Sequence, residues 1–235
     1  MNLIIFITHN FNKEFLNTLL KLNNYENILL NYKIIVLFDN KHNYDNNIET
    51  KLNNIEIIKI NKINISYDYL GHTLYINYFK NNYNEIKKYE YIWIIENDVY
   101  YPNCFIKFFD CYNEYNYDLL VSEYGLRNSS WCWNKSLKGF KNIYNIGVLA
   151  VIMRFSQKFL LKLIDTLENI HYGYLEAILP HICIEYNFSI HQFLPEMCGI
   201  LSVNNNLPLM KLIIKDIQDN TNIYIENKIY HPIKL

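Results

Sequence analysis

Short runs of consecutive apolar residues, each ended by polar residues, most strongly limit how this chain folds. Leu3 to Ile7 and Tyr91 to Ile95 are such runs, and the apolar-rich segments Lys33 to Phe38 and Ile55 to Ile60 are predicted as two further strands in the first hundred residues. A strand that is apolar on both faces is typical of a parallel sheet covered by helices on both sides. Since segments with helical spacing of apolar residues separate the runs, the sequence predicts an α/β protein with a central, mostly parallel sheet flanked by helices.

Helix starts can be predicted from capping residues. Asn12 is a suitable N-cap after the first strand, and Phe11 and Leu16 have the spacing of a hydrophobic staple. Ser156 is predicted to cap a second helix that runs to about Asn169, and Pro102 suits the first turn of an aromatic-rich helix.

The second half of the chain shows weaker patterns. We expect strands at 119–122 and 147–153, with a loop over 125–139 between them. A helix near 173 should be bent or interrupted at Pro180, because proline cannot donate a backbone hydrogen bond. From Asn187 onward we expect only short strands and loops.

Composition excludes several classes of protein. The 235 residues carry a formal net charge of -1, so a broad basic surface for nucleic acid is not expected. Hydrophobic residues make up 51% of the chain, which favours one folded domain over residues 1–235 rather than disorder.

The chain shows no membrane or zinc-binding signature. No apolar stretch approaches the roughly 20 residues that span a bilayer, and the N-terminal run reads as a buried strand rather than a signal peptide. The five cysteines are scattered without a C-x-x-C pair, which argues against a zinc site and a disulfide framework. We therefore expect a cytoplasmic protein, and the sequence gives no indication of its oligomeric state.

Two acidic residues follow the fourth apolar run. Glu96 and Asp98 are two positions apart, so both side chains can point the same way just beyond the carboxyl end of Tyr91 to Ile95. Open α/β sheets bind ligands at that edge. Paired carboxylates suit Mg²⁺ or Mn²⁺, hard ions that bridge protein oxygens to phosphates. The alternative is a solvated turn with no ligand.

An apolar strand followed by Glu96-Asn97-Asp98-Val99 resembles the D-x-D signature of GT-A glycosyltransferases, and the order of predicted elements before it is similar to that fold. The resemblance implies a Rossmann-like sheet with a nucleotide-sugar-binding half at 1–100 and an acceptor-binding half at 101–235. It also implies that Asp98, with Glu96, holds Mn²⁺ or Mg²⁺ on the donor diphosphate. Glu96 departs from the pattern by one methylene group.

The same resemblance assigns further donor contacts. Thr8 and Asp39 match the strand-end positions that cradle the nucleoside, although Asp39 can equally form an Asx turn with its own backbone. Gly71 and His72 lie where a helix N-terminus can present N–H groups to a diphosphate. His231 resembles a late histidine that completes the metal shell, and Lys234 is close enough in sequence to neutralise phosphate.

The acceptor side has four candidate residues from the sequence and the resemblance. Glu176 lies in the first turn of a predicted helix, where the dipole favours the ionised form that a catalytic base needs, or simply stabilises the helix. Glu123 is the reserve candidate. Trp131 and Trp133, two apart in a loop, can form an apolar wall for an acceptor sugar or pack in the core.

The function that the resemblance implies is transfer of a sugar from a nucleotide-diphosphate sugar, with a UDP-sugar as one candidate, to a glycan or other hydroxyl acceptor. Two alternatives remain open at the level of sequence. A sugar nucleotidyltransferase shares the topology but usually carries a Gly-rich, basic loop after the first strand, which is not found here. A GT-A-like module that binds a glycan or a protein partner without turnover is the other.

Overall fold

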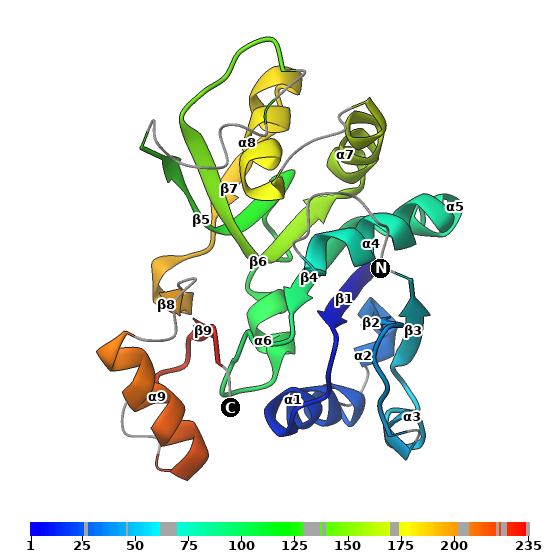
Figure 1. Cartoon of the computed structure of the whole chain (residues 1–235), viewed down its shortest axis with the longest axis vertical. Helices are drawn as coiled ribbons and strands as arrows, with labels where there is room; N and C mark the ends of the chain where they lie inside the picture. Colours follow the sequence, from blue (N-terminus) through cyan, green and yellow to red (C-terminus); the bar gives the residue numbers. More distant parts are fainter. Residues whose placement is uncertain are drawn as a thin grey trace.

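The computed structural model describes residues 1–25, 28–45, 47–61, 70–128, 137, 140–169, 174–201, 207–219, 221 and 225–233. At its centre is a seven-stranded sheet with the order β3-β2-β1-β4-β6-β5-β7 (Figure 1). The strands are β1 (Asn2–Thr8), β2 (Tyr32–Asp39), β3 (Glu56–Ile60), β4 (Tyr91–Glu96), β5 (Leu119–Leu126), β6 (Ile146–Ser156) and β7 (Ile190–Gln192). Only β6 runs antiparallel to its two neighbours, β4 and β5, so the predicted α/β fold with a mostly parallel sheet is confirmed.

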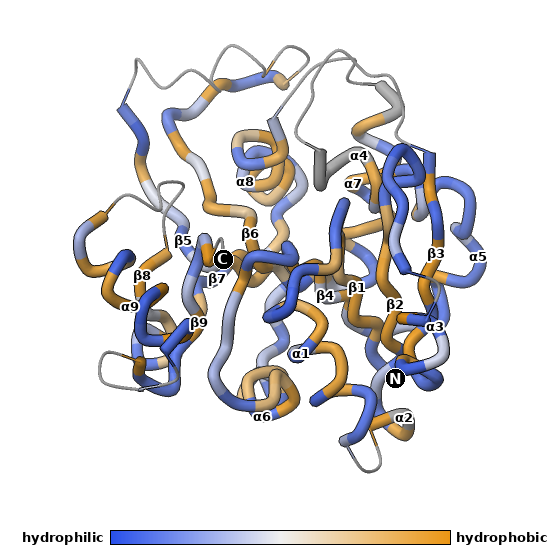
Figure 2. Tube along the Cα trace, turned by 60° about the horizontal axis from the view of Figure 1, so that its bottom comes forward, coloured by the Kyte–Doolittle hydropathy of each residue, from blue (hydrophilic) through white to orange (hydrophobic). Residues whose placement is uncertain are grey.

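Helices cover both faces of this sheet. One face packs against α1 (Lys13–Asn23), α2 (Ile28–Asn31), α3 (Asn47–Lys51) and α6 (Phe105–Asp110), and the other against α4 (Leu70–Asn81), α5 (Tyr83–Ile86), α7 (Gln157–Asn169) and α8 (Leu175–Tyr186). Successive residues of β1 alternate between the two cores: Ile5 joins the α4, α7 and α8 side, whereas Phe6 joins the α1 and α6 side. Apolar residues dominate the strands in Figure 2, as burial on both faces requires.

Both predicted N-caps are present. The Asn12 side chain accepts a hydrogen bond of 2.8 Å from the Phe15 N–H, and the Ser156 hydroxyl accepts one of 3.2 Å from the Phe159 N–H. The predicted start at Pro102 was wrong, because α6 begins at Phe105 after an extended Cys104. The fixed φ of proline serves the preceding bend equally well.

Helix α8 is continuous through Pro180, so the interruption predicted there does not occur. Its residues from Leu175 to Cys183 are almost all buried, and this packing outweighs the one hydrogen bond that Pro180 cannot donate.

A smaller C-terminal unit lies beside the end of β4 (Figure 1). It consists of β8 (Cys198–Leu201) and β9 (Ile229–His231), which pair in parallel, the short 3-10 turn Pro195–Met197, and helix α9 (Pro208–Asp219). The prediction of only short strands and loops after Asn187 was wrong for α9. Its buried Met210 and Ile213 are three apart and pack on Tyr230.

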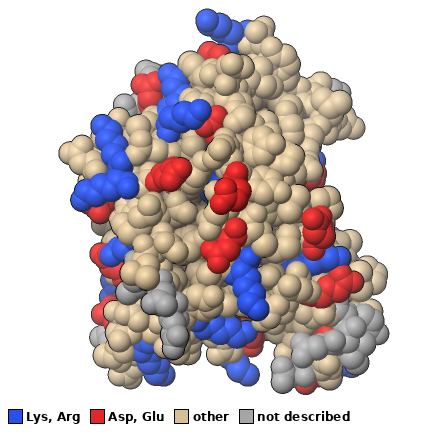
Figure 3. Space-filling model, turned by 180° about the vertical axis from the view of Figure 1, so that it is seen from behind, with Lys and Arg blue, Asp and Glu red and all other residues tan. Residues whose placement is uncertain are grey.

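The charged side chains on the surface and the lengths of the helices agree with what the composition predicts. Lys and Arg side chains are interspersed with Asp and Glu on the face seen in Figure 3, in keeping with a net charge of -1. Among the described residues, no helix is long and apolar enough to cross a membrane.

Candidate metal centre

The central strand β4 delivers the acidic pair to the carboxyl edge of the sheet. Residues 91–95 are buried, and burial ends at Glu96, where the strand stops. The Val99 N–H then bonds the Glu96 carbonyl at 3.1 Å, so Asn97 and Asp98 form a tight turn. The turn is tied to the loop after β1, because the Asn97 side chain donates to the Asn10 side chain at 3.1 Å.

The C-terminal segment is bonded directly to this turn. Tyr100 and Tyr230 pair through their backbones, and the Ile233 N–H donates to the Asp98 carbonyl at 2.9 Å. The His231–Pro232 peptide bond between these two attachments is cis. The two attachments hold His231 against the acidic pair, although the pair lies in the middle of the sequence and His231 near its end.

Glu96, Asp98 and His231 converge on one point. The His231 Nε2 atom lies 3.2 Å from Asp98 Oδ1 and 3.3 Å from Glu96 Oε2. One ligand atom from each of the three residues lies within 4.8 Å of the others. The side chains are 29%, 17% and 7% exposed for Glu96, Asp98 and His231, so the carboxylates still face solvent whereas the imidazole is walled in.

Electrostatics couple the three side chains. Burial by itself lowers the pKa of His231, but hydrogen bonds and charges from Asp98 and Glu96 outweigh it and raise the pKa to about 9. The pKa of Tyr75, which is fully buried in α4, is raised well above its usual value by burial and by the charge of Glu96. Sequence reasoning missed Tyr75, since its only signal is its place one turn after Gly71.

The three side chains fit a divalent cation. Two carboxylates and one imidazole supply two hard oxygen ligands and one nitrogen ligand, a set suited to Mn²⁺ and related ions. Among the described residues, no other group of three or more His, Cys, Asp or Glu side chains brings its ligand atoms this close together. The two carboxylates would leave part of the coordination shell open toward solvent, where phosphate oxygens can bind.

The predicted nucleoside positions lie at the same edge of the sheet. Thr8 ends β1, and its hydroxyl accepts a 3.0 Å hydrogen bond from the Asn10 N–H. Asp39 ends β2 and is fully buried. Its Oδ1 accepts from the Lys41 N–H at 3.0 Å, which is the Asx turn considered from sequence, whereas its buried Oδ2 has no hydrogen-bond partner among the described residues.

The remaining donor candidates and the two acceptor-side tryptophans are only partly described. Gly71 and His72 lie in the first turn of α4, as predicted, although the description does not extend to the His72 side chain. Lys234, Trp131 and Trp133 lie outside the described residues.

The two acidic acceptor-side candidates are not part of the three-residue cluster. Glu176 lies in the first turn of α8, two residues after the N-cap residue Tyr174, and is half-buried. Glu123 lies on β5, and its carboxylate forms an ion pair with Arg127.

No protein-family model matches the sequence, and no curated protein matches it. Solved structures that resemble the chain include GlyE, a glycosyltransferase of Streptococcus pneumoniae, at 13% identity and a TM-score of 0.46 over 99% of this chain and 54% of that one. Mouse xyloside xylosyltransferase 1 is similar at 10% identity and 0.47, over 98% and 96% of the two chains. A galactosyltransferase, LgtC, in complex with donor and acceptor sugar analogs is similar at 11% and 0.46, over 100% and 87%.

Each of these three structures is a glycosyltransferase. The chain spans about half of GlyE and nearly all of the xylosyltransferase. At such low identity the likeness concerns the fold, and what the site does has to follow from its own geometry.

Proposed function

We propose that this chain is a metal-dependent glycosyltransferase that moves a sugar from a nucleotide-diphosphate sugar, such as a UDP-sugar, to a hydroxyl acceptor. The observation that carries the proposal is the convergence of Glu96, Asp98 and His231 at the carboxyl end of β4. Ligand sites of open α/β sheets lie at this edge.

Glu96, Asp98 and His231 would hold Mn²⁺ or Mg²⁺. When bound, the cation neutralises negative charge that develops on the leaving diphosphate. The protein contributes the fixed geometry: the turn after β4 sets the two carboxylates, and the Tyr100–Tyr230 backbone pair sets the imidazole. Such pre-organisation spares the site from rearranging during the reaction.

Residues 1–100 would bind the nucleotide. The unpartnered Asp39 Oδ2 supports this assignment, because a buried oxygen without a hydrogen bond is costly unless a ligand donates to it. Ribose or base N–H and O–H groups are donors of this kind. Thr8 lies on the adjacent strand, and the N-terminus of α4 at Gly71 and His72 would offer backbone N–H groups to the diphosphate. Lys234 would add positive charge there.

Residues 101–235 would bind the acceptor and complete the metal shell through His231. We assign Glu176 as the base that deprotonates the acceptor hydroxyl if the reaction inverts the anomeric centre, since the α8 N-terminus favours its ionised form. Trp131, Trp133 and Glu123 remain the candidate acceptor contacts. The scattered cysteines support a reducing, cytoplasmic setting.

A thermal-shift panel tests the proposal. Common nucleotide sugars and nucleoside diphosphates would be added with and without Mn²⁺ to the wild type, to Asp98→Ala, and to the exposed control Asp219→Ala. Binding to the native state raises the midpoint by mass action, so a Mn²⁺-dependent shift with one nucleotide should appear in the wild type and in the control only.

Release of nucleoside diphosphate in the presence of candidate acceptors then measures turnover. A nucleotide-dependent shift without turnover under any acceptor would assign a catalytically silent binding module instead. Absence of a shift with every nucleotide would refute the donor site.

A further inference from the structure

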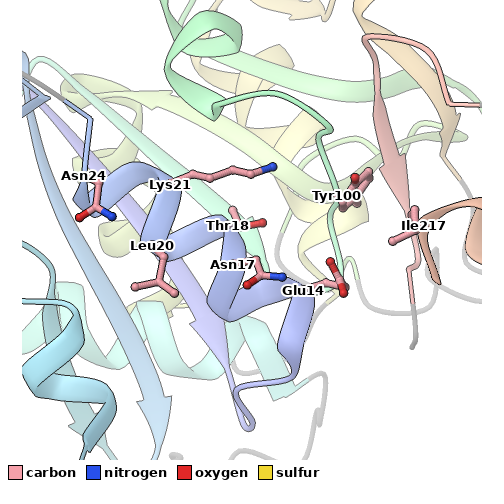
Figure 4. A pocket seen from close by; sticks show the side chains of 8 residues that line it. All are labelled: Glu14, Asn17, Thr18, Leu20, Lys21, Asn24, Tyr100 and Ile217. Carbon is pink, nitrogen blue, oxygen red and sulfur yellow. The ribbon is translucent and has the colours of Figure 1, made fainter. Parts of the chain in front are cut away.

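A cavity of about 550 Å³ lies between α1 and the segment that follows the metal turn (Figure 4). Its size falls within the roughly 300 to 1,000 Å³ typical of small-molecule sites. Glu14, Asn17, Thr18 and Lys21 line one side from α1, and Tyr100 and Ile217 face them across the cavity. None of these residues was singled out from the sequence, and the metal centre does not use them.

Several polar groups around this cavity lack protein partners. Within the described part of the chain, the Glu14 carboxylate, the Asn17 amide, the Thr18 hydroxyl and the Tyr100 hydroxyl make no hydrogen bond to another side chain or backbone group. Thr18 is only 9% exposed, and burial raises the pKa of Tyr100, with the nearby charge of Glu14 adding to the effect. Asn17 is exposed and Glu14 and Tyr100 are half-buried, so these groups meet solvent in the cavity and are available to hydrogen-bond a ligand that displaces it.

The charges around the cavity indicate the kind of ligand. Glu14 supplies one negative charge and Lys21 one positive charge, so the lining is neutral overall and selects neither a phosphate nor a cation. Lys21 Nζ donates to the Pro102 carbonyl at 3.2 Å, which fixes the ammonium at the rim. Carboxylate, amide and hydroxyl groups together offer both donors and acceptors, and the Tyr100 ring with Ile217 adds an apolar wall.

We propose that this cavity binds a neutral saccharide unit. Vicinal hydroxyls match the mixed donors and acceptors of Glu14, Asn17 and Thr18, and the C–H face of a sugar ring matches the Tyr100 side. The cavity is adjacent to the metal turn, because Glu14 and Tyr100 also line a small cavity against Asp98. We assign this unit to a longer acceptor glycan, and that assignment rests on the proposed sugar transfer. The binding of a saccharide in the cavity does not depend on it.

Ligand-observed saturation-transfer NMR tests the inference without metal or nucleotide. The probes are methyl glucoside, methyl galactoside, N-acetylglucosamine and lactose, titrated into the wild type, Asn17→Leu and Thr18→Val. Matched controls are Asn81→Leu on α4 and Thr50→Val on α3, both exposed in the native protein. Each cavity variant should weaken binding of the preferred saccharide roughly five- to tenfold, the effect of losing about one hydrogen bond, and the controls should not.

Asp98→Ala separates this site from the donor site. We expect it to retain saccharide binding while it loses the Mn²⁺-dependent nucleotide shift. Binding of no probe, equal binding by Thr18→Val and the wild type, or loss of saccharide binding in Asp98→Ala would each overturn the inference. If saccharides bind but no nucleotide does, the cavity assignment stands and the glycosyltransferase proposal fails.

Discussion

Tyr100 and Tyr230 exchange two backbone hydrogen bonds, each 2.9 Å long, although one lies in the middle of the sequence and the other near its end. Asp98 precedes the first tyrosine by two residues, and His231 follows the second directly. The pair therefore fixes the separation of the imidazole from the carboxylates. A substitution that moves Tyr230 should therefore change the geometry of the candidate metal centre.

The Tyr230 ring depends on Gly199 of β8. A Cβ atom on Gly199 would lie 2.4 Å from Cε1 of the ring, far inside van der Waals contact. The ring has little freedom to move, because Tyr230 is 3% exposed and its hydroxyl accepts a 2.9 Å hydrogen bond from the Glu226 N–H. A side chain at position 199 must displace the ring or separate β8 from β9.

Gly199→Ala is therefore expected to weaken Mn²⁺ binding about tenfold, as is common when a residue that orients a metal ligand is changed. Isothermal titration calorimetry of the variant, well below its unfolding temperature, measures the effect. Gly125→Ala is the matched control, since a Cβ there would meet nothing within 4 Å. Adding Tyr230→Leu to Gly199→Ala should partly restore the affinity for Mn²⁺, because the smaller side chain makes room for the methyl group. If Gly199→Ala alone binds Mn²⁺ as tightly as the wild type, the prediction is wrong.

His231→Gln should lower the affinity for Mn²⁺ by at least about tenfold, because one of three ligand side chains is lost and no charge is added. The same titration measures it, with His191→Gln on β7 as control. Unchanged Mn²⁺ affinity in His231→Gln would place the cation, if it binds, on the carboxylates alone.

Arg154 is expected to dominate the stability of the sheet near Trp93. Its guanidinium is 1% exposed, donates to the carbonyls of Tyr112 at 2.6 Å and of Tyr115, and lies 4.0 Å from the Tyr91 ring centroid. Lysine cannot reach two carbonyls with one planar group. We expect Arg154→Lys to cost about 2 to 4 kcal/mol in urea unfolding, and Arg127→Lys much less. A loss below that of Arg127→Lys would show that the carbonyls find other partners.

The parts of the molecule that sequence predicted are those set by local patterns. Continuous apolar runs identified the buried strands, and the position of Glu96 and Asp98 after one of them placed both side chains at the sheet edge. Asn12 and Ser156 act as caps through contacts within three residues. All these features depend on neighbours in the chain.

The features that sequence could not predict depend on distant contacts. In the sequence, only the resemblance to a late histidine of GT-A enzymes indicated a role for His231. Its position is set by the backbone pairing of Tyr100 with Tyr230, which leaves no local pattern. Helix α9 was missed because buried Met210 and Ile213 are each directly preceded by an exposed leucine, Leu209 and Leu212, which makes the inward-facing side hard to recognise in the sequence. The unpartnered Asp39 Oδ2 becomes visible only when its surroundings are known.

His181 should make the protein more sensitive to mild acid. Its Nε2 accepts a 2.9 Å hydrogen bond from the Tyr144 N–H, so the ring proton is on Nδ1, which donates to the Ala177 carbonyl at 2.7 Å. Burial lowers the pKa of His181 below 6.5, although the Nδ1–H bond to the Ala177 carbonyl and the charge of Glu185 oppose this. A lowered pKa means that the unfolded chain binds the proton more tightly, so the stabilisation is complete above about pH 6.5 and is lost as the pH falls below it. Urea unfolding between about pH 7.5 and pH 5 should thus show a smaller pH dependence for His181→Gln than for the wild type and for the exposed control His9→Gln; equal slopes in all three would exclude His181 as the titrating group.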